Sequence, residues 1–411
     1  MKKIIDETES LSPLTGRPIP AQVVQTAKGV YLEKEDEQGK FYCSLIEKDI
    51  DFYHSFKNEK RDLKCHLEAI VVFVSSQCNL RCSFCYEEKG SREKEPNLLE
   101  LEQFVSTFKN KHIALGGLEP TCRDNLDDVI RIVAKNNYAE LITNGLKLSD
   151  MNYVKGLKEA GLKSVFFSFN GMKEAVYKEI NSAEIFEDKL KALANLKILK
   201  IPTVISATIV RGVNDQEINK LYEFCRQNKD FIRQLRIRSA TNTGRYVKVE
   251  AMPLSELLDL VCSALTIDKQ SVINEQKLFN ELAELFGLSY FRRRRCSLFF
   301  HLKDDDKGEG KPVGRYIKEK LILHKWFRYV LIPYYMFSCY GIKYILKQIL
   351  ILLNLPHQWV KTDIFRIGLR SWPDMYTIDL QENRKCTTGY YRGGKLEPFC
   401  YTNIVSNYRA E

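Results

Sequence analysis

Between residues 69 and 238, six short apolar runs alternate with longer stretches of helical periodicity. The runs are rich in Val, Ile, Phe and Leu and have the length of buried strands, whereas the stretches between them repeat apolar residues at helical spacing. The predicted strands are residues 69–76, 112–115, 139–142, 164–167, 203–209 and 234–238. The predicted helices include residues 98–108, 124–135, 173–199 and 216–228. Strands and helices that alternate in this way form a parallel sheet with helices outside it, so we expect an α/β fold.

Three cysteines, Cys78, Cys82 and Cys85, follow the first predicted strand within eight residues. They lie on a loop that leaves the carboxyl end of a buried strand, where parallel sheets bind ligands. Three thiolates suit a 4Fe-4S cluster, because four irons with three protein ligands leave one iron open to a small molecule. The alternatives are a structural zinc site or three unrelated thiols. Zinc normally needs a fourth Cys or His at short spacing, and none follows Cys85 nearby.

Polar and glycine-containing turns follow the next strands in order. The second strand runs into Gly116-Gly117-Leu118-Glu119-Pro120, the third into Thr143-Asn144-Gly145 and the fourth into Ser168-Phe169-Asn170-Gly171. Each turn alone is an ordinary one. Several of them in this order after the cysteine motif are much harder to dismiss as ordinary turns.

The Cys-x3-Cys-x2-Cys spacing, with the aromatic Phe84 directly before the third cysteine, resembles the radical S-adenosylmethionine (SAM) superfamily. The resemblance implies a partial (β/α)6 barrel and a cluster on the three cysteines, whose open iron binds the amino and carboxylate groups of SAM. One electron from the cluster then cleaves SAM to methionine and a 5′-deoxyadenosyl radical. Leu118 takes the place of the second glycine in the superfamily's Gly-Gly-Glu-Pro turn, where a side chain can crowd SAM. The SAM-binding residues that the resemblance implies are Phe84, Tyr86, Gly116, Gly117, Glu119, Thr143, Asn144, Ser168, Asn170 and Arg238.

The N-terminal residues 10–21 are similar to the small metal-binding domain of archaeal tetraether synthase and its pterin-methyltransferase relatives. Ser12 and Thr15 stand where that group has Cys-Pro-x-Cys, and Glu35 and Gln38 stand where it has Cys-Pro-x-His-Gly. Hydroxyls and amides are poor ligands for zinc or iron beside thiolate and imidazole. We therefore expect a β-rich N-terminal domain that keeps the family's shape without its metal.

The C-terminal residues 365–403 resemble the closing region of the same group, which helps to hold metal centres beyond the radical cluster. The candidate ligands of a second iron–sulfur cluster are Cys386 and Cys400, with Cys296 as a third and Cys339 as a fourth. The stretch around Cys386 is also similar to the SPASM extension of peptide-modifying radical enzymes, although the close run of cysteines in that extension is missing.

The bulk composition fits an intracellular enzyme. The chain has 411 residues, 44% of them hydrophobic, which is enough for a large core. Its 12 cysteines are not in the dense pattern of a secreted scaffold, and its first residues do not read as a signal peptide, so we expect a cytoplasmic protein. The predicted parts are an N-terminal domain over residues 1–60, the barrel over 65–300 and a helical C-terminal extension over 301–411.

Residues 316–356 read as amphipathic helices rich in Trp, Tyr, Phe, Ile and Leu, with Lys and Arg interspersed. The basic residues leave no apolar run long enough to span a bilayer. The segment is therefore predicted to be a helical appendage that packs on the barrel, an interfacial membrane contact or the wall of a cavity for a hydrophobic substrate. The net charge of +10 does not by itself identify a partner, and we predict no nucleic acid.

The motifs together predict a radical SAM enzyme that abstracts hydrogen from an unactivated carbon and takes its electron from a reductase such as a ferredoxin or flavodoxin. The family resemblance favours C–C bond formation or alkylation on a lipid-like or other hydrophobic substrate. Three alternatives stay open: a peptide maturase, methyl or methylene transfer to a pterin-like small molecule, and a scaffold that binds iron–sulfur or lipid without turnover.

Overall fold

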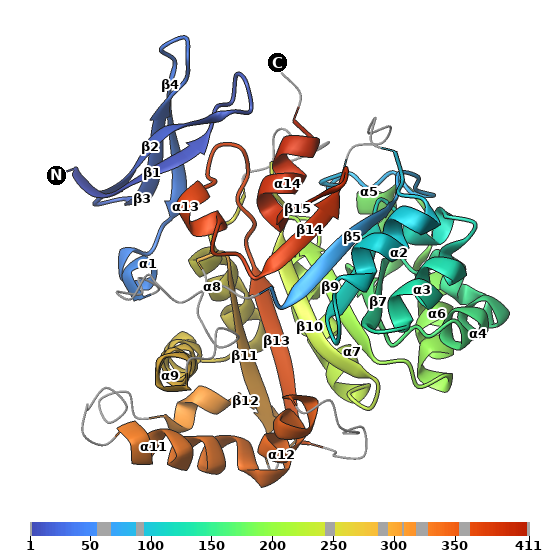
Figure 1. The fold of residues 1–411 in the computed structure, drawn as a ribbon. Helices are drawn as coiled ribbons and strands as arrows, with labels where there is room; N and C mark the ends of the chain where they lie inside the picture. Colours follow the sequence, from blue (N-terminus) through green and yellow to red (C-terminus); the bar gives the residue numbers. More distant parts are fainter. Residues whose placement is uncertain are drawn as a thin grey trace.

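The computed structural model describes residues 2–55, 67–87, 94–242, 251–286, 295–305, 308–317, 328–352 and 362–408. These residues form a small N-terminal sheet and one large sheet that contains every other described strand (Figure 1). Cys65 and most of the predicted helical stretch 321–329 lie outside the described residues.

The small sheet is an antiparallel meander in the order β1-β2-β3-β4. Val23, Val30 and Leu32 are buried on one face, where they pack with Tyr53 of the following helix. Because side chains alternate between the two faces of a strand, the residues between them face outward. The elements are β1 (Lys3–Leu11), β2 (Pro18–Thr26), β3 (Gly29–Glu35), β4 (Phe41–Glu47) and α1 (Ile50–Ser55).

The large sheet has 11 strands in the order β12-β11-β13-β10-β9-β8-β7-β6-β5-β14-β15. Its centre is the run of six parallel strands that the sequence predicts, each within two residues of its expected limits: β5 (Ala69–Ser75), β6 (His112–Gly117), β7 (Tyr138–Thr143), β8 (Ser164–Ser168), β9 (Thr203–Ile209) and β10 (Ile232–Ser239). The α/β fold predicted from the alternating pattern is thus confirmed.

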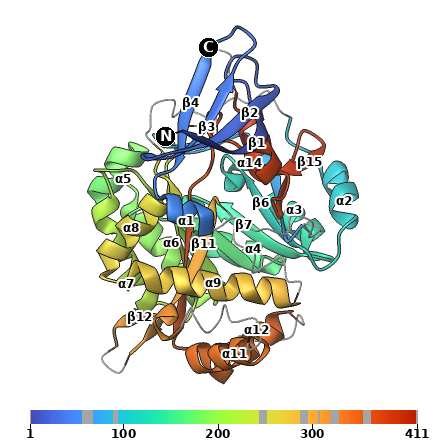
Figure 2. The same ribbon diagram turned by 90° about the vertical axis from the view of Figure 1, so that its left-hand side faces the viewer.

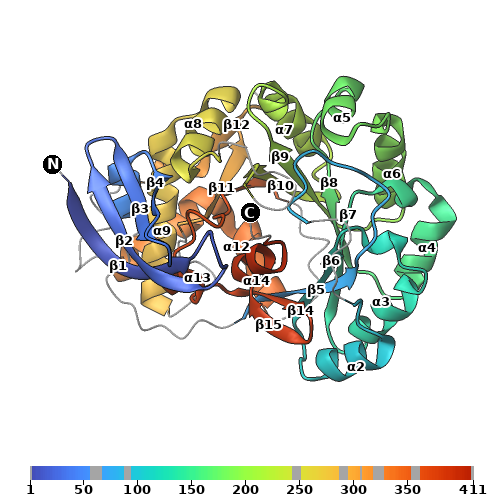
Figure 3. The ribbon, with the colours of Figure 1, turned by 90° about the horizontal axis from the view of Figure 1, so that it is seen from above.

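The helices that connect these strands lie outside the sheet, which follows an arc when seen from above (Figure 3). They are α2 (Leu98–Ser106), α3 (Leu126–Ala134), α4 (Met151–Glu159), α5 (Glu174–Asn181), α6 (Phe186–Ile198) and α7 (Ile218–Gln227). The single predicted helix over residues 173–199 is two helices, α5 and α6, because Ser182 takes a left-handed backbone conformation with φ 53°. In β5, Ile70, Val72 and Val74 face the helices and Val71 and Phe73 face the inner side, so both faces of this strand are buried.

The C-terminal extension, predicted to be helical, also completes the large sheet at both edges. On one side β13 (Ile364–Arg370) pairs parallel with β10, followed by the antiparallel strands β11 (Ser297–Asp304) and β12 (Gly310–Pro312). On the other side β14 (Thr388–Arg392) pairs parallel with β5, followed by β15 (Lys395–Pro398). Short helices α13 (Leu380–Asn383) and α14 (Phe399–Ser406) accompany the second edge. The sheet therefore continues well past residue 300.

A second hydrophobic core lies at the other end of the sheet, under two helices of the extension. There α11 (Arg328–Tyr335), the π-helical turn η6 (Met336–Tyr340) and α12 (Gly341–Leu352) pack near α9 (Lys269–Phe286), which follows α8 (Leu254–Leu265). Buried Glu275 of α9 accepts hydrogen bonds from Tyr340 (2.5 Å) and pairs with His301 of β11 (2.6 Å). Among the described residues, no helix is both long and apolar enough to cross a membrane.

The N-terminal sheet is fastened to the C-terminal loop between β13 and α13. Lys34, which is only 3% exposed, donates hydrogen bonds to the backbone oxygens of Leu11 (2.8 Å) and Met375 (2.6 Å). Thr8 donates to the carboxylate of Asp379 at 2.6 Å. Leu11 joins the apolar side chains of this loop and of α14 in one small core. The two ends of the chain are therefore held together.

Candidate functional site

The cysteine loop leaves the end of β5 as predicted, and it brings the three thiols close to one another. The backbone N–H of Cys85 donates to the oxygen of Cys82 (3.3 Å), and the sulfur of Cys78 accepts from the N–H of Leu80 (3.3 Å). Burial, followed by the neighbouring thiols of Cys82 and Cys78, raises the pKa of Cys85 to about 12. Such thiols become thiolates when a bound metal supplies positive charge.

The donor set fits an iron–sulfur cluster. Three thiols on one loop match a cubane that has one open iron. Among the described residues, no three His, Cys, Asp or Glu side chains converge as they would around one metal ion. A cubane needs a wider arrangement of thiolates than a single metal ion does, because each thiolate binds a different iron.

The amide of Asn181 contacts the cysteine loop from the end of α5. Its Nδ2 donates to the sulfur of Cys82 at 2.9 Å, and its side chain is 4% exposed. Next to it, the N–H and hydroxyl of Ser83 donate to the oxygen of Ile180 at 2.8 and 3.0 Å. Hydrogen bonds to cluster sulfurs affect reduction potential, so Asn181 is a functional candidate that no sequence motif indicated.

The glycine-containing turn after β6 is bonded directly to the start of the cysteine loop. The N–H of Leu118 donates to the oxygen of Ser75 and that of Glu119 to the oxygen of Gln77, both at 2.9 Å. Gly117 has φ +118°, and a Cβ there would lie 2.5 Å from the Ser75 oxygen, so this position requires glycine. Leu118 is not among the described residues with positive φ.

Several of the side chains predicted to bind SAM also form hydrogen bonds that hold strand ends together. The carboxylate of Glu119 accepts from the hydroxyls of Thr121 and Thr143, both at 2.6 Å, and from the N–H of Asn144 at 2.7 Å. The oxygen of the Asn170 side chain accepts from the N–H of Thr208 on β9 at 2.9 Å. Glu119 and Asn170 thus fix the strand ends that surround the site. The side-chain amide of Asn144 contacts the cysteine loop directly, because it donates a hydrogen bond to the side-chain oxygen of Asn79 at 2.7 Å.

A buried lysine links the ends of β7 and β8 by hydrogen bonds. Lys189 of α6 is 1% exposed, and its ammonium donates to the oxygens of Asn144 (2.6 Å) and Ser168 (2.8 Å). Burial lowers its pKa to about 8, while Cys82 and Glu119 oppose the shift. Nothing in the sequence distinguishes this lysine from the surface lysines of α6.

Aromatic residues of the C-terminal extension cover the end of the cysteine loop. Trp372, which follows β13, stands edge-on to Tyr86 with ring centroids 5.0 Å apart, and Phe399 of α14 lies 6.4 Å from Tyr86. The guanidinium of Arg238, at the end of β10, lies 4.9 Å from the Trp372 ring and 6.0 Å from the Tyr86 ring. Burial lowers the pKa of Arg238 and raises that of Tyr86.

A buried ion pair anchors this cover. Arg392 of β14 lies 2.8 Å from the carboxylate of Glu87, and both side chains are at most 2% exposed. Glu87 also accepts from Tyr390 (3.1 Å) and from Asn407 (3.3 Å) near the C-terminus. The two residues after Cys85 are thereby tied to β14 and to α14. Sequence reasoning missed this pair because its partners are about 300 residues apart.

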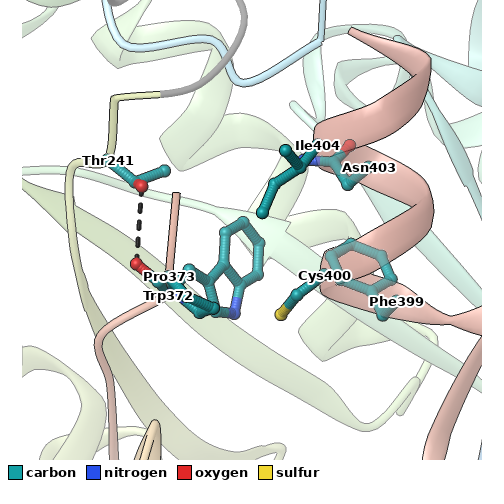
Figure 4. A pocket seen from close by; sticks show the side chains of 7 residues that line it. All are labelled: Thr241, Trp372, Pro373, Phe399, Cys400, Asn403 and Ile404. Atoms are coloured by element: carbon teal, nitrogen blue, oxygen red, sulfur yellow. Dashed lines mark hydrogen bonds between the residues drawn. The ribbon is translucent and has the colours of Figure 1, made fainter. Parts of the chain in front are cut away.

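A small hollow with room for about one water molecule lies between α14 and the ends of β10 and β13 (Figure 4). It is lined by Thr241, Trp372, Pro373, Phe399, Cys400, Asn403 and Ile404. Near it, Arg238 Nε, Trp372 Nε1 and Asn242 Oδ1 are buried without a hydrogen-bond partner. Buried polar atoms are rarely left unpaired, so this region can accept the polar groups of a ligand.

The candidate ligands of a second cluster do not all lie in one place, because Cys339 is far from Cys400. Cys400 points into the hollow toward Trp372 (Figure 4). Cys339 is buried in the core under α11 and α12, at the opposite end of the sheet (Figure 1). That separation excludes Cys339 as a partner of Cys400. The sulfur of Cys386 contacts the oxygen of Thr388 at 3.4 Å, and Cys296 precedes β11. The described residues group none of these cysteines in a site of three or more.

In the N-terminal domain, a hydrogen-bonded cluster includes two of the residues that stand where the resembling group has its metal ligands. The hydroxyls of Ser12 and Thr15 both donate to the carboxylate of Glu37, each at 2.6 Å. These bonds lower the pKa of Glu37. The residue that faces them is thus Glu37 rather than Glu35 or Gln38.

Comparison with known protein families finds a match over the part of the chain that contains the cysteine loop. Residues 72–225 match the family model of the Radical SAM superfamily. The 7,8-dihydro-6-hydroxymethylpterin dimethyltransferase of Methanocaldococcus jannaschii is 27% identical over 58% of this chain and 54% of its own length. The GTP 3′,8-cyclase of Helicobacter pylori is 29% identical over 47% of this chain and 63% of its own. The chain thus spans about half to two thirds of these relatives.

Among solved structures, Streptococcus suis SuiB bound to S-adenosylmethionine aligns with a TM-score of 0.41 and 19% identity, over 48% of this chain and 46% of that one. The family match covers the cysteine loop and the strands β5 to β9 around it. Residues 72–225 of this chain therefore match the superfamily that the three cysteines predict.

Proposed function

We propose that this chain is a radical SAM enzyme in which Cys78, Cys82 and Cys85 hold a 4Fe-4S cluster and SAM binds at the open iron. The observation that carries the proposal is the cysteine loop, fastened by two backbone hydrogen bonds to the Gly116-Gly117 turn. When bound and reduced by a ferredoxin or flavodoxin, the cluster supplies the electron that cleaves SAM to a hydrogen-abstracting 5′-deoxyadenosyl radical. The arc of β5 to β10 supports our inference of a partial (β/α)6 barrel like that of the superfamily.

The residues of this chain have two tasks in that reaction. Glu119, Asn170 and Lys189 hold the ends of β6, β7, β8 and β9 in fixed positions beside the cysteines. The aromatic cover of Tyr86, Trp372 and Phe399 keeps water from the end of the cysteine loop. Arg238, with a buried Nε that lacks a partner, is suited to an anionic group of SAM or of the substrate.

A partly polar substrate fits this site better than a lipid. The unpaired polar atoms beside the hollow favour a molecule with hydrogen-bonding groups. The enclosed space of the hollow is about 10 Å³, which is room for about one water molecule, so the hollow does not select a substrate by size. The apolar helices α11 and α12, for which the wall of a hydrophobic cavity is one of three predicted roles, lie at the far end of the sheet (Figure 1).

We therefore favour transfer of a methyl or methylene group to a pterin-like ring, in keeping with the name of the M. jannaschii relative. C–C bond formation on a lipid-like substrate, a peptide maturase and a scaffold without turnover stay as alternative predictions.

The test is anaerobic incubation of the reconstituted protein with SAM and dithionite, followed by detection of 5′-deoxyadenosine. We expect its formation in the wild type and its loss in the variant with all three loop cysteines replaced by Ala. Unchanged 5′-deoxyadenosine in that variant would refute the proposal. Adding a reduced pterin, a lipid or a peptide in parallel then identifies the substrate class from the mass of the product. Methyl or methylene transfer adds a SAM-derived carbon to the pterin, whereas joining carbons of a lipid or peptide removes hydrogen from it.

A second cluster stays a prediction that iron analysis of the triple variant decides. About four irons per chain, lost again in Cys386→Ala and Cys400→Ala, would require a second cubane. Absence of iron would leave one cluster per chain. The zinc content of the same sample tests whether the N-terminal domain binds metal, and we expect no stoichiometric metal there.

A further inference from the structure

The positive charge of this protein is concentrated in one segment of the C-terminal extension. Residues 310–362 contain nine Lys and Arg and a single acidic residue, Glu319, so they hold a surplus of eight positive charges out of the chain's ten. The described parts of this segment, residues 310–317 and 328–352, hold five basic residues and no acidic one. Of these five, Arg315 and Lys343 are exposed, and exposed basic residues attract anionic partners.

The same segment exposes two apolar stripes. On α11 and η6 the stripe is Val330, Tyr334 and Phe337, and on α12 it is Ile342, Leu346 and Ile349. Each set has the spacing i, i+4, i+7, which places its members on one face of a helix. These six side chains are between 39% and 69% exposed. We call them the apolar face.

The apolar face is separate from the side of these helices that packs on the protein. Ile332, Tyr335 and Tyr340 point inward and are buried with Phe279 of α9. Tyr344 of α12 is hydrogen-bonded to His301 of β11 at 2.8 Å. The helices are therefore anchored through one side while the other faces solvent. Contiguous exposed apolar residues of this kind mark an interaction site.

Basic and aromatic side chains flank the apolar face. Lys343 is exposed directly beside Ile342, and Arg315 and Tyr316 are exposed on η5 (Val313–Tyr316), which packs against η6. The guanidinium of Arg315 lies over the Tyr316 ring at 4.6 Å. In Figure 2, α11 and α12 form the lower end of the molecule, far from the N-terminal sheet. The face is thus free of both the cysteine loop and its cover.

We propose that the apolar face docks this enzyme on an anionic lipid surface, with α11 and α12 lying flat in the interface. The occupant must be both apolar and negatively charged, which excludes a second copy of the same basic face. Nucleic acid offers the charge without a surface for six aliphatic and aromatic side chains. A bilayer with anionic headgroups offers both, and basic amphipathic helices bind it by apolar burial together with charge attraction. Docking at this end leaves the cysteine loop facing away from the membrane.

The test is sedimentation of the full-length protein with vesicles of phosphatidylcholine and phosphatidylglycerol in equal parts, compared with pure phosphatidylcholine. We expect binding to the anionic vesicles that weakens as salt is raised. The double variant Phe337→Asp/Ile342→Asp should weaken it about tenfold or more, and Lys343→Gln about fivefold. Ile198→Asp, on the equally exposed Ile198 of α6, is the matched control and should bind like the wild type.

Two outcomes would overturn the proposal. One is the absence of binding to anionic vesicles, or equal binding to both kinds of vesicle that salt does not change. The other is a wild-type oligomer in the absence of lipid that Phe337→Asp/Ile342→Asp dissociates, since the apolar face would then join copies of the chain. The wild type and the three variants should form equal amounts of 5′-deoxyadenosine without vesicles. A failure of the docking proposal can therefore be distinguished from a failure of the proposed radical chemistry.

Discussion

At the scale of single residues, the predictable part of the site is the part that chemistry restricts to one residue type. Only cysteine supplies three thiolates and only glycine fits at Gly117, so both could be recognised without a structure. Asn181 and Lys189 could not, because an amide or an ammonium acts here through its position in the fold. The same holds for Glu119, predicted as a SAM contact, whose carboxylate is used to hold strand ends together.

Asn181→Leu should lower the midpoint potential of the cluster, because the donated hydrogen bond to Cys82 stabilises the more negative, reduced form. A bond worth about 1 kcal/mol corresponds to about 40 mV for one electron. A redox titration followed by electron paramagnetic resonance measures the shift. The control is Asn195→Leu, a buried amide on α6 whose partners are the oxygens of Leu148 and Ser149. Equal shifts in both variants would contradict the role of Asn181.

Leu118→Gly should preserve SAM binding or tighten it, whereas Gly117→Ala should weaken it. The backbone at 117, with φ +118°, has no room for a Cβ against the Ser75 oxygen, while 118 already carries a side chain without positive φ. Calorimetric titration of the reconstituted proteins with SAM compares them. A large loss of affinity in Leu118→Gly would mean that the leucine packs against SAM itself.

At the scale of elements, local pattern predicted the six central strands and failed for the two parallel strands added at their edges. Continuous apolar runs such as residues 203–209 are recognisable as buried strands. By contrast, β14 has the sequence Thr-Gly-Tyr-Tyr-Arg, which shows no strand periodicity. It pairs with β5, more than 300 residues earlier in the chain, with Thr388 opposite Ala69. Pairing at such separation is decided by tertiary contacts, here the Glu87–Arg392 pair.

Arg392→Met should lower the free energy of unfolding by about 3 kcal/mol, because Glu87 would be left buried without its cation. Urea denaturation followed by circular dichroism measures the change. The double variant Glu87→Leu/Arg392→Met removes both charges, so it should recover part of the loss. A single variant as stable as the wild type would show that β14 is held to the cysteine loop by its apolar contacts alone.

At the scale of the whole molecule, the two ends of the chain meet around the site. The N-terminal sheet contacts the loop after β13, and this loop carries Trp372 of the aromatic cover. Lys34 is central to that junction, with hydrogen bonds to Ser10, Leu11 and Met375. The resemblance at both ends of the sequence predicted two appended parts, but nothing in either segment indicated that they bind each other.

Lys34→Met should destabilise the protein, and the loss should grow with pH. Burial lowers the pKa of Lys34 to about 8, partly opposed by Asp374, so between pH 8 and 10.5 the unfolded chain holds the proton that the folded protein releases. The contribution of Lys34 to stability therefore rises through that range, by about 1 kcal/mol per pH unit. At pH 7.5 we expect a loss of about 2 kcal/mol from the unpaired backbone oxygens. Urea denaturation at pH 7.5, 8.5 and 9.5 measures both effects, with exposed Lys147→Met as the control. A difference between wild type and Lys34→Met that stays constant from pH 7.5 to 9.5 would mean that water reaches the ammonium and that the two ends of the chain separate in solution.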